Sequence, residues 1–220
     1  MATVSQVGWP LPFWYVHRVA LIRHAQSVWN ADQRWQGWAD PPLSEVGEME
    51  ALAVGRALAT GTLGELITGA AVSSDLRRAR QTAELLADQL GLPRPEVIDP
   101  ELREIDVGNW SGLRREEIAL RWPDELRAWD AGTATSAPGG EDRSEFASRV
   151  LAAVGRWLDS AEGVTRLVVT HGGVIRIVNR SAGAPGGPVP NLAGVLVESS
   201  GPGADPGRWV NTALAVAPTG

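Results

Sequence analysis

The chain has 220 residues, 44% of them hydrophobic, no cysteine and a net charge of −6. This length and composition exclude a disordered chain and predict one globular α/β domain over residues 1–220 with a sizeable core. The acidic balance argues against nucleic acid or an anionic membrane as a partner. The lack of cysteine excludes disulfides and thiolate metal sites, and it fits a cytoplasmic protein.

The chain begins with residues 1–16, which we interpret as an N-terminal arm. Its apolar run, residues 7–16, is interrupted by Pro10 and Pro12 and follows no basic segment. The run is also too short to cross a bilayer, so we expect neither a signal peptide nor a membrane anchor. Residues 16–22 predict a buried strand, because a short run of Val, Ala, Leu and Ile there ends at a charged pair.

Two helices flank a short strand in the next part of the chain. The ranges are 44–59 for the first helix, 70–73 for the strand and 75–90 for the second helix. Apolar residues recur at helical spacing in both helices. Ser44 is a suitable N-cap for the first helix and Ser74 or Asp75 for the second, which Gly91 ends.

The second half of the chain continues the alternation of helices and strands. It contains helices at 141–158 and 172–180 and strands at 166–170, 192–198 and 208–215. The alternation predicts a three-layer α/β sandwich, in which helices cover both faces of a mixed, mainly parallel sheet. Residues 132–140 contain Gly and Pro, and we expect them to cover a site.

Polar residues stand at the carboxyl ends of three predicted strands. The pairs are Arg23–His24, Ser73–Ser74 and Thr170–His171. Ligands of such sheets bind beyond the carboxyl ends of the strands. We therefore expect these three segments to converge on one crevice.

Two of the three histidines lie at these strand ends. His17 falls inside the first strand and carries no predicted role, whereas His24 follows Arg23 and His171 precedes a Gly–Gly pair. A single strand-end histidine is more often structural than catalytic, but neutral imidazole is also a good phosphoryl acceptor. Phosphoryl transfer needs positive groups around the phosphate oxygens, which arginine supplies. The backbone N–H groups of Gly172 and Gly173, at a helix start, would add to such an anion site.

Six segments together resemble the signature of the histidine phosphatase superfamily, which includes the cofactor-dependent phosphoglycerate mutases. In the family's order they are 23–30 (RHAQSVWN), 37–44 (GWADPPLS), 74–83 (SDLRRARQTA), 102–112 (LREIDVGNWSG), 139–141 (GGE) and 169–173 (VTHGG). Any one of them alone would be a weak signal. The resemblance extends over roughly residues 18–215, and it implies a phosphoglycerate mutase-like fold.

The resemblance also implies a set of site residues. His24 would be phosphorylated, and Arg23, Arg78 and His171 would complete the phosphate pocket. Arg78 is chosen over Arg77 and Arg80 because the family's arginine directly precedes Ala. Asn30, Gln36 and Gly37 would line the pocket, with no metal and no cofactor.

Glu104 matches the family's proton donor. An ester oxygen that leaves as an alkoxide needs a proton, which a carboxyl group in a closed pocket can supply; the carboxylate can then activate water against phosphohistidine. The alternative is an ordinary loop glutamate, like Glu101, Glu116 or Glu117. Ala25 departs from the family, which usually has Gly there; Ala would be strained if this position had a positive φ, and its methyl group could narrow the pocket.

The resemblance favours a hydrolase over a mutase. Mutases carry Arg after the donor glutamate, where this chain has Ile105, and an aromatic hydroxyl where it has Val107. Residues 113–140 lack the mutase insertion and are expected to form a substrate lid that contains Trp122 and Trp129. We therefore expect a metal-independent phosphomonoesterase that acts on a small phosphorylated metabolite.

Several alternatives stay open at the level of sequence. They are a cofactor-dependent phosphoglycerate mutase and a non-catalytic phosphate-binding protein. The sequence does not identify the physiological substrate, and it neither indicates nor excludes a homodimer. A binuclear metal hydrolase and a P-loop enzyme have no supporting motif.

Overall fold

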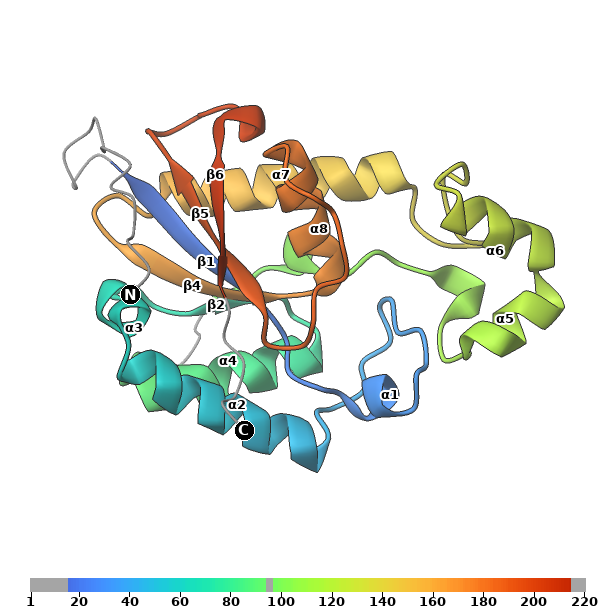
Figure 1. Ribbon diagram of the computed structural model, residues 1–220, viewed down its shortest axis with the longest axis horizontal. Coiled ribbons are helices and arrows are strands. Elements are labelled where there is room, and N and C mark those ends of the chain that lie inside the picture. Colours follow the sequence, from blue (N-terminus) through green and yellow to red (C-terminus); the bar gives the residue numbers. More distant parts are fainter. Residues whose placement is uncertain (1–15, 94–96, 215–220) are drawn as a thin grey trace, which may run out of the picture.

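A six-stranded mixed sheet forms the centre of the protein in the computed structural model, which describes residues 16–93 and 97–214 (Figure 1). Its strand order is β3-β2-β4-β1-β5-β6. The strands are β1 (His17–Arg23), β2 (Val72–Ser73), β3 (Val97–Ile98), β4 (Thr165–Thr170), β5 (Gly194–Ser199) and β6 (Val210–Leu214). Strands β1 to β4 pair in parallel, whereas β5 and β6 are antiparallel to their neighbours. The predicted mixed, mainly parallel sheet is confirmed.

Helices cover both faces of this sheet (Figure 1). They are α1 (Val28–Ala31), α2 (Glu45–Ala59), α3 (Thr62–Leu66), α4 (Arg77–Leu90), α5 (Arg115–Arg121), α6 (Pro123–Asp130), α7 (Arg143–Asp159) and α8 (Gly172–Ser181). Short 3-10 helices lie at Pro100–Leu102, Gly108–Trp110 and Pro206–Arg208. Helices α5 and α6 lie at the right of the view, away from the sheet.

Alternation along β1 divides the core into two clusters. Val19 and Leu21 pack with the apolar faces of α7 and α8, whereas Ala20 and Ile22 pack with α2 and α4 on the other side. This alternation follows from the two-residue period of a strand. Burial on both faces explains why the strand sequence is almost wholly apolar, and the expected three-layer fold is confirmed.

Most of the longer predicted elements are confirmed within a few residues. The short β3, α1, α3, α5 and α6 are absent from the predictions, because two to eight residues carry too little periodicity. The expected arm at residues 1–16 lies, apart from Val16, outside the described residues. No helix within 16–93 and 97–214 combines the length and apolarity needed to cross a membrane.

The predicted cap of α4 is wrong. The N-cap position is Leu76, which offers no side-chain hydrogen bond. Asp75 instead forms an ion pair with Arg103, and the Ser74 hydroxyl contacts His171. Asp40, from a distant loop, accepts the hydrogen bond of the Arg77 N–H. Tertiary contacts thus replace the local cap, whereas Gly91 ends the helix in the left-handed region as predicted.

Candidate active site

The carboxyl ends of β1, β4 and β2 lie side by side. Arg23 pairs in register with Thr170, and Ser73 pairs with Val169. The backbone N–H of His24 donates to the Thr170 carbonyl over 2.9 Å, so the residue just after β1 is tied to the end of β4. The predicted convergence of the three segments is confirmed.

His24 is oriented by hydrogen bonds on both ring nitrogens. Nδ1 lies 2.7 Å from the carbonyl oxygen of Ala25, and Nε2 lies 3.2 Å from Nε of Arg78. A carbonyl only accepts hydrogen bonds and a guanidinium only donates them. Nδ1 therefore carries the proton of the neutral ring, and Nε2 carries the lone pair.

Burial and nearby positive charge keep this ring neutral. Desolvation is the largest cause that holds the pKa of His24 well below the ordinary value of 6.5, and the charges of Arg78 and Arg23 act in the same direction. The unprotonated form, which is the nucleophilic one, therefore prevails at neutral pH.

Arg78 projects from the first turn of α4 and is 1% exposed. Its Nη1 and Nη2 donate to the carbonyls of Ala39 and Gly37 over 2.7 and 2.9 Å. Burial lowers the pKa of Arg78 to about 10, which leaves the guanidinium charged at neutral pH. Gly37 has a φ of +50°, and a Cβ there would lie 2.8 Å from the Val107 backbone N, so this position requires glycine.

His171 and Arg23 complete the group around His24. The His171 ring centroid lies 5.1 Å from that of His24, and its Nε2 is 2.9 Å from the Ser74 hydroxyl. Arg23 donates from Nη1 to the Val189 carbonyl. The buried Nδ1 of His171 and Nε of Arg23 have no hydrogen-bond partner among the described residues. Such groups are costly to bury, and an anion with several acceptor oxygens could satisfy the donor of Arg23.

Glu104 is held by two backbone N–H groups. Its Oε1 accepts from Ile105 over 3.0 Å, and its Oε2 accepts from Gly173 over 2.9 Å. The N–H of Gly173 is therefore occupied by a carboxylate, and the expectation that it faces a bound phosphate is wrong. A Cβ on Gly173 would lie 1.9 Å from Oε1, so the approach of Glu104 depends on glycine.

Arg149 on α7 holds the segment that carries Glu104. Its guanidinium donates to the backbone carbonyls of Glu101, Arg103 and Glu104. It also pairs with Glu141, whose second oxygen accepts from the Asp106 N–H. The Gly-Gly-Glu segment at 139–141 thus supports residues 103–107, which we call the glutamate loop and which lie between two 3-10 helices. This role was not predicted from the sequence.

A pocket of about 330 Å³, which we call the catalytic pocket, opens beside these groups. Its lining includes Arg23, His24, Asn30, Gln36, Gly37, Arg78 and Glu104, together with Arg34, Trp35, Ile105, Val107, Trp129 and Arg176. Seven of the nine predicted site residues therefore lie in its wall. The two others, His171 and Gly172, are not part of this lining. The ring of His171 contacts that of His24, and Gly172 directly follows His171.

Sequence reasoning missed Arg34, Trp35 and Arg176 as lining residues. Arg176 lies one helical turn after Gly172 on α8, so the helical pattern was the available signal. The structure also answers the question about Ala25, which is buried in the α2–α4 cluster and does not line the described pocket. Ala25 is not among the described residues with positive φ, so its methyl group strains no turn.

The expected lid, residues 113–140, contributes Trp129 to the catalytic pocket, while Trp122 packs against the core. Within the described parts of the chain, no group of three or more His, Cys, Asp or Glu side chains is arranged to hold a metal ion.

Comparison with known proteins places the chain in a family. The family model for the histidine phosphatase superfamily (branch 1) matches residues 19–193. A 2,3-bisphosphoglycerate-dependent phosphoglycerate mutase of Methylocella silvestris is 38% identical over 72% of this chain and 77% of its own length. A glucosyl-3-phosphoglycerate phosphatase of Mycolicibacterium vanbaalenii is 36% identical over 73% of this chain and 71% of its own.

Solved structures agree with this assignment. Mycobacterial glucosyl-3-phosphoglycerate phosphatase in complex with VO3 superposes with a TM-score of 0.73 at 28% identity, covering 90% of this chain and 98% of that one. YhfR of Bacillus stearothermophilus gives a TM-score of 0.71 at 29% identity, covering 82% and 90%. Sequence and structure therefore lead to the same conclusion: the chain belongs to the histidine phosphatase superfamily.

Proposed function

We propose that this protein is a metal-independent phosphomonoesterase that forms a phosphohistidine at His24. The observation that carries the proposal is the state of His24, a buried and neutral imidazole whose Nε2 lone pair lies next to the guanidinium of Arg78. A nucleophile adjacent to a fixed positive charge is what attack on a phosphate ester requires.

The first step transfers the phosphoryl group to the protein. Nε2 of His24 attacks phosphorus, the bond from phosphorus to the ester oxygen breaks, and Glu104 gives its proton to the leaving oxygen. Arg23 and Arg78 neutralise charge on the three non-bridging oxygens, which is the main contribution a protein makes to phosphoryl transfer.

The second step regenerates the enzyme. Glu104, now a carboxylate, takes a proton from water, the water oxygen bonds to phosphorus, and the bond from phosphorus to Nε2 breaks to release inorganic phosphate. The same carboxyl group serves as acid and then as base. Asn30, Gln36, Gly37 and His171 would help to position the phosphoryl group, and residues 113–140 would form the lid.

Hydrolysis rather than mutase action is supported by the pocket lining. Ile105 and Val107 present apolar side chains at the two positions where the resemblance leads one to expect the mutases' Arg and aromatic hydroxyl. Relatives named as mutases are nevertheless as similar as those named as phosphatases. Mutase activity is therefore the alternative that the experiment must address.

The test is turnover of p-nitrophenyl phosphate and a panel of phosphomonoesters in the presence of EDTA. We expect phosphate release that neither the chelator nor added Mg²⁺ changes. A parallel assay with 3-phosphoglycerate and 2,3-bisphosphoglycerate should give no isomerisation at a comparable rate. Folded protein without activity on the panel would refute the proposal that the protein is a phosphatase. Activity that is lost to EDTA and restored by metal would refute metal independence. Efficient isomerisation would favour the mutase.

A further inference from the structure

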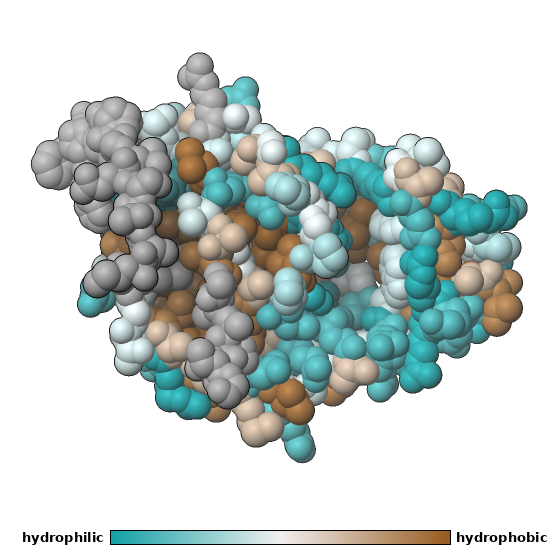
Figure 2. Space-filling view, in the orientation of Figure 1, coloured by the Kyte–Doolittle hydropathy of each residue, from teal (hydrophilic) through white to brown (hydrophobic). Residues whose placement is uncertain are grey.

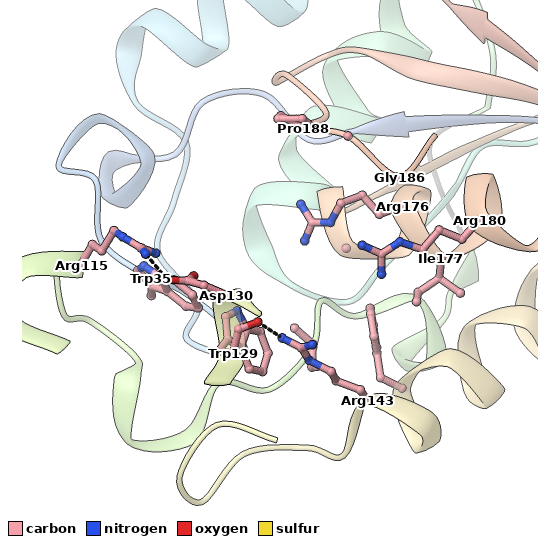
Figure 3. Close-up of a pocket in the computed structure, with 14 residues that line it drawn as sticks. Trp35, Arg115, Trp129, Asp130, Arg143, Arg176, Ile177, Arg180, Gly186 and Pro188 are labelled. Carbon is pink, nitrogen blue, oxygen red and sulfur yellow. Dashed lines mark hydrogen bonds and ion pairs between the residues drawn. The ribbon is translucent and has the colours of Figure 1, made fainter. Parts of the chain in front are cut away.

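A second, larger cavity adjoins the catalytic pocket. This cavity, which we call the outer chamber, has a volume of about 770 Å³ and shares Trp35, Ile105, Trp129 and Arg176 with the catalytic pocket (Figure 3). The face of the protein between the sheet and α5–α6 is predominantly hydrophilic (Figure 2). A ligand held by its phosphate at His24 can therefore extend directly into the chamber.

The outer chamber is unusually rich in positive charge. Four arginines line it, at positions 115, 143, 176 and 180, against the single carboxylate of Asp130. Asp130 is paired with Arg115. Among the described residues, Arg143, Arg176 and Arg180 form no ion pair with a carboxylate.

These three guanidinium groups lie close enough to affect one another. Figure 3 shows Arg176 and Arg180 extending from α8 toward the open space, while Arg143 rises from the start of α7 beside Trp129. Burial is the largest cause that lowers the pKa of Arg143, and the charges of Arg180 and Arg176 lower it further. Three like charges around one cavity repel one another unless an anion lies between them.

The spacing of residues along α8 indicates where an anion could bind relative to the catalytic pocket. Gly173 holds Glu104 at the catalytic pocket, and Arg176 and Arg180 follow on the same side of the helix three and seven residues later. At the α-helical rise these positions lie about 4.5 and about 10.5 Å further along the axis. Ile177 and Trp129 supply apolar wall in the same cavity.

We propose that the substrate is an extended phosphomonoester with a second anionic group, a carboxylate or another phosphate, that binds Arg143, Arg176 and Arg180. The carbon skeleton between the two anions lies against Trp129 and Ile177. The placement of the reacting phosphate rests on the proposed function. The chain as a whole carries a net charge of −6, so the positive charge of the chamber is a local feature and not a property of the whole surface.

Matched sugar phosphates test the proposal, since each pair differs in one distal anion. Fructose 1,6-bisphosphate is compared with fructose 6-phosphate, and 6-phosphogluconate with sorbitol 6-phosphate, which is also an open chain; the two pairs separate a distal phosphate from a distal carboxylate. Charge-assisted hydrogen bonds predict a kcat/KM preference of about tenfold or more for the second anion. In Arg143→Gln and Arg180→Gln this preference should fall toward one.

Arg56→Gln is the matched control, since Arg56 is exposed on α2, lines neither pocket and forms no ion pair among the described residues. It should retain the full preference. Equal kcat/KM within each pair, or a preference that survives in both chamber variants, would overturn the proposal even if hydrolysis is efficient.

Binding to His24→Ala protein, measured by calorimetry, separates this inference from the proposed function. Tighter binding of fructose 1,6-bisphosphate than of fructose 6-phosphate, abolished by Arg180→Gln, would support the second anion site even if no phosphate ester were hydrolysed. Equal binding of the two would count against it.

Discussion

His24 combines two properties that reinforce each other, a neutral ring and close positive charge. The buried ring and the neighbouring Arg78 and Arg23 all disfavour its protonation, and His171 is shifted in the same direction by burial and by Arg78. The chain has three histidines, which makes each of them accessible to NMR.

The first prediction concerns pH. Because the pKa values of both rings in the folded state lie below 6.5, the NMR signals of His24 and His171 should remain those of neutral imidazole as pH falls from 7 through 6.5. The unfolded chain takes up these protons near 6.5 and the folded chain does not, so the free energy of unfolding should decrease as pH falls through that range. Protonation of either ring at or above 6.5 would contradict the prediction.

The second prediction concerns Glu104. Glu104→Gln removes the proton that an alkoxide leaving group needs, so kcat/KM on alkyl phosphates, which reports only the steps up to phosphoryl transfer to His24, should fall by about 10²–10⁴. The loss should be much smaller on p-nitrophenyl phosphate, whose leaving group needs no proton. Glu101→Gln changes an exposed glutamate nearby and should have little effect on either substrate. Equal losses of Glu104→Gln in kcat/KM on both substrates would show that the carboxyl group does not act as an acid.

At the scale of elements, the start of α8 positions both His171 and Glu104: His171 is the N-cap residue, and the Gly173 N–H donates to Glu104. Gly173→Ala places a methyl group where Oε1 of Glu104 now lies, since the built Cβ is only 1.9 Å away. We expect a loss of about 10² in kcat on alkyl phosphates from the displaced carboxyl group. Gly155→Ala in α7, where the Cβ meets only Trp209 at 3.9 Å, is the control. Full activity of Gly173→Ala would argue against the role of Glu104.

The junction between α7 and the glutamate loop gives a prediction on stability. The side chains of Arg149 and Glu141 are only 14% and 12% exposed. Removal of one partner of a buried pair leaves the other uncompensated, so Arg149→Leu should lower the free energy of unfolding by about 3–5 kcal/mol. The Arg149→Leu/Glu141→Gln double variant should recover part of this loss in urea unfolding, and additive effects would contradict the coupling.

At the scale of the whole molecule, the sequence predicts the sheet and its edge well but not the contacts between distant segments. Buried strands and strand-end residues carry local signals, so the convergence of His24, Ser74 and His171 follows from strand order. The hydrogen bonds from the Arg77 N–H to Asp40 and from the Gly173 N–H to Glu104 depend on tertiary packing. Local sequence patterns carry no information about such contacts. The arginines of the outer chamber come from α5, α7 and α8, and no single segment shows that they line one cavity.

The central claim is that the phosphoryl group passes through Nε2 of His24. The most direct measurement is rapid quenching of the reaction with a labelled phosphomonoester, followed by mass spectrometry of the peptide that contains His24. We predict acid-labile, base-stable phosphate on His24 in the wild-type protein, and neither label nor turnover in His24→Ala. Steady turnover without trapped phosphohistidine, label on another residue, or an active His24→Ala protein would contradict the account.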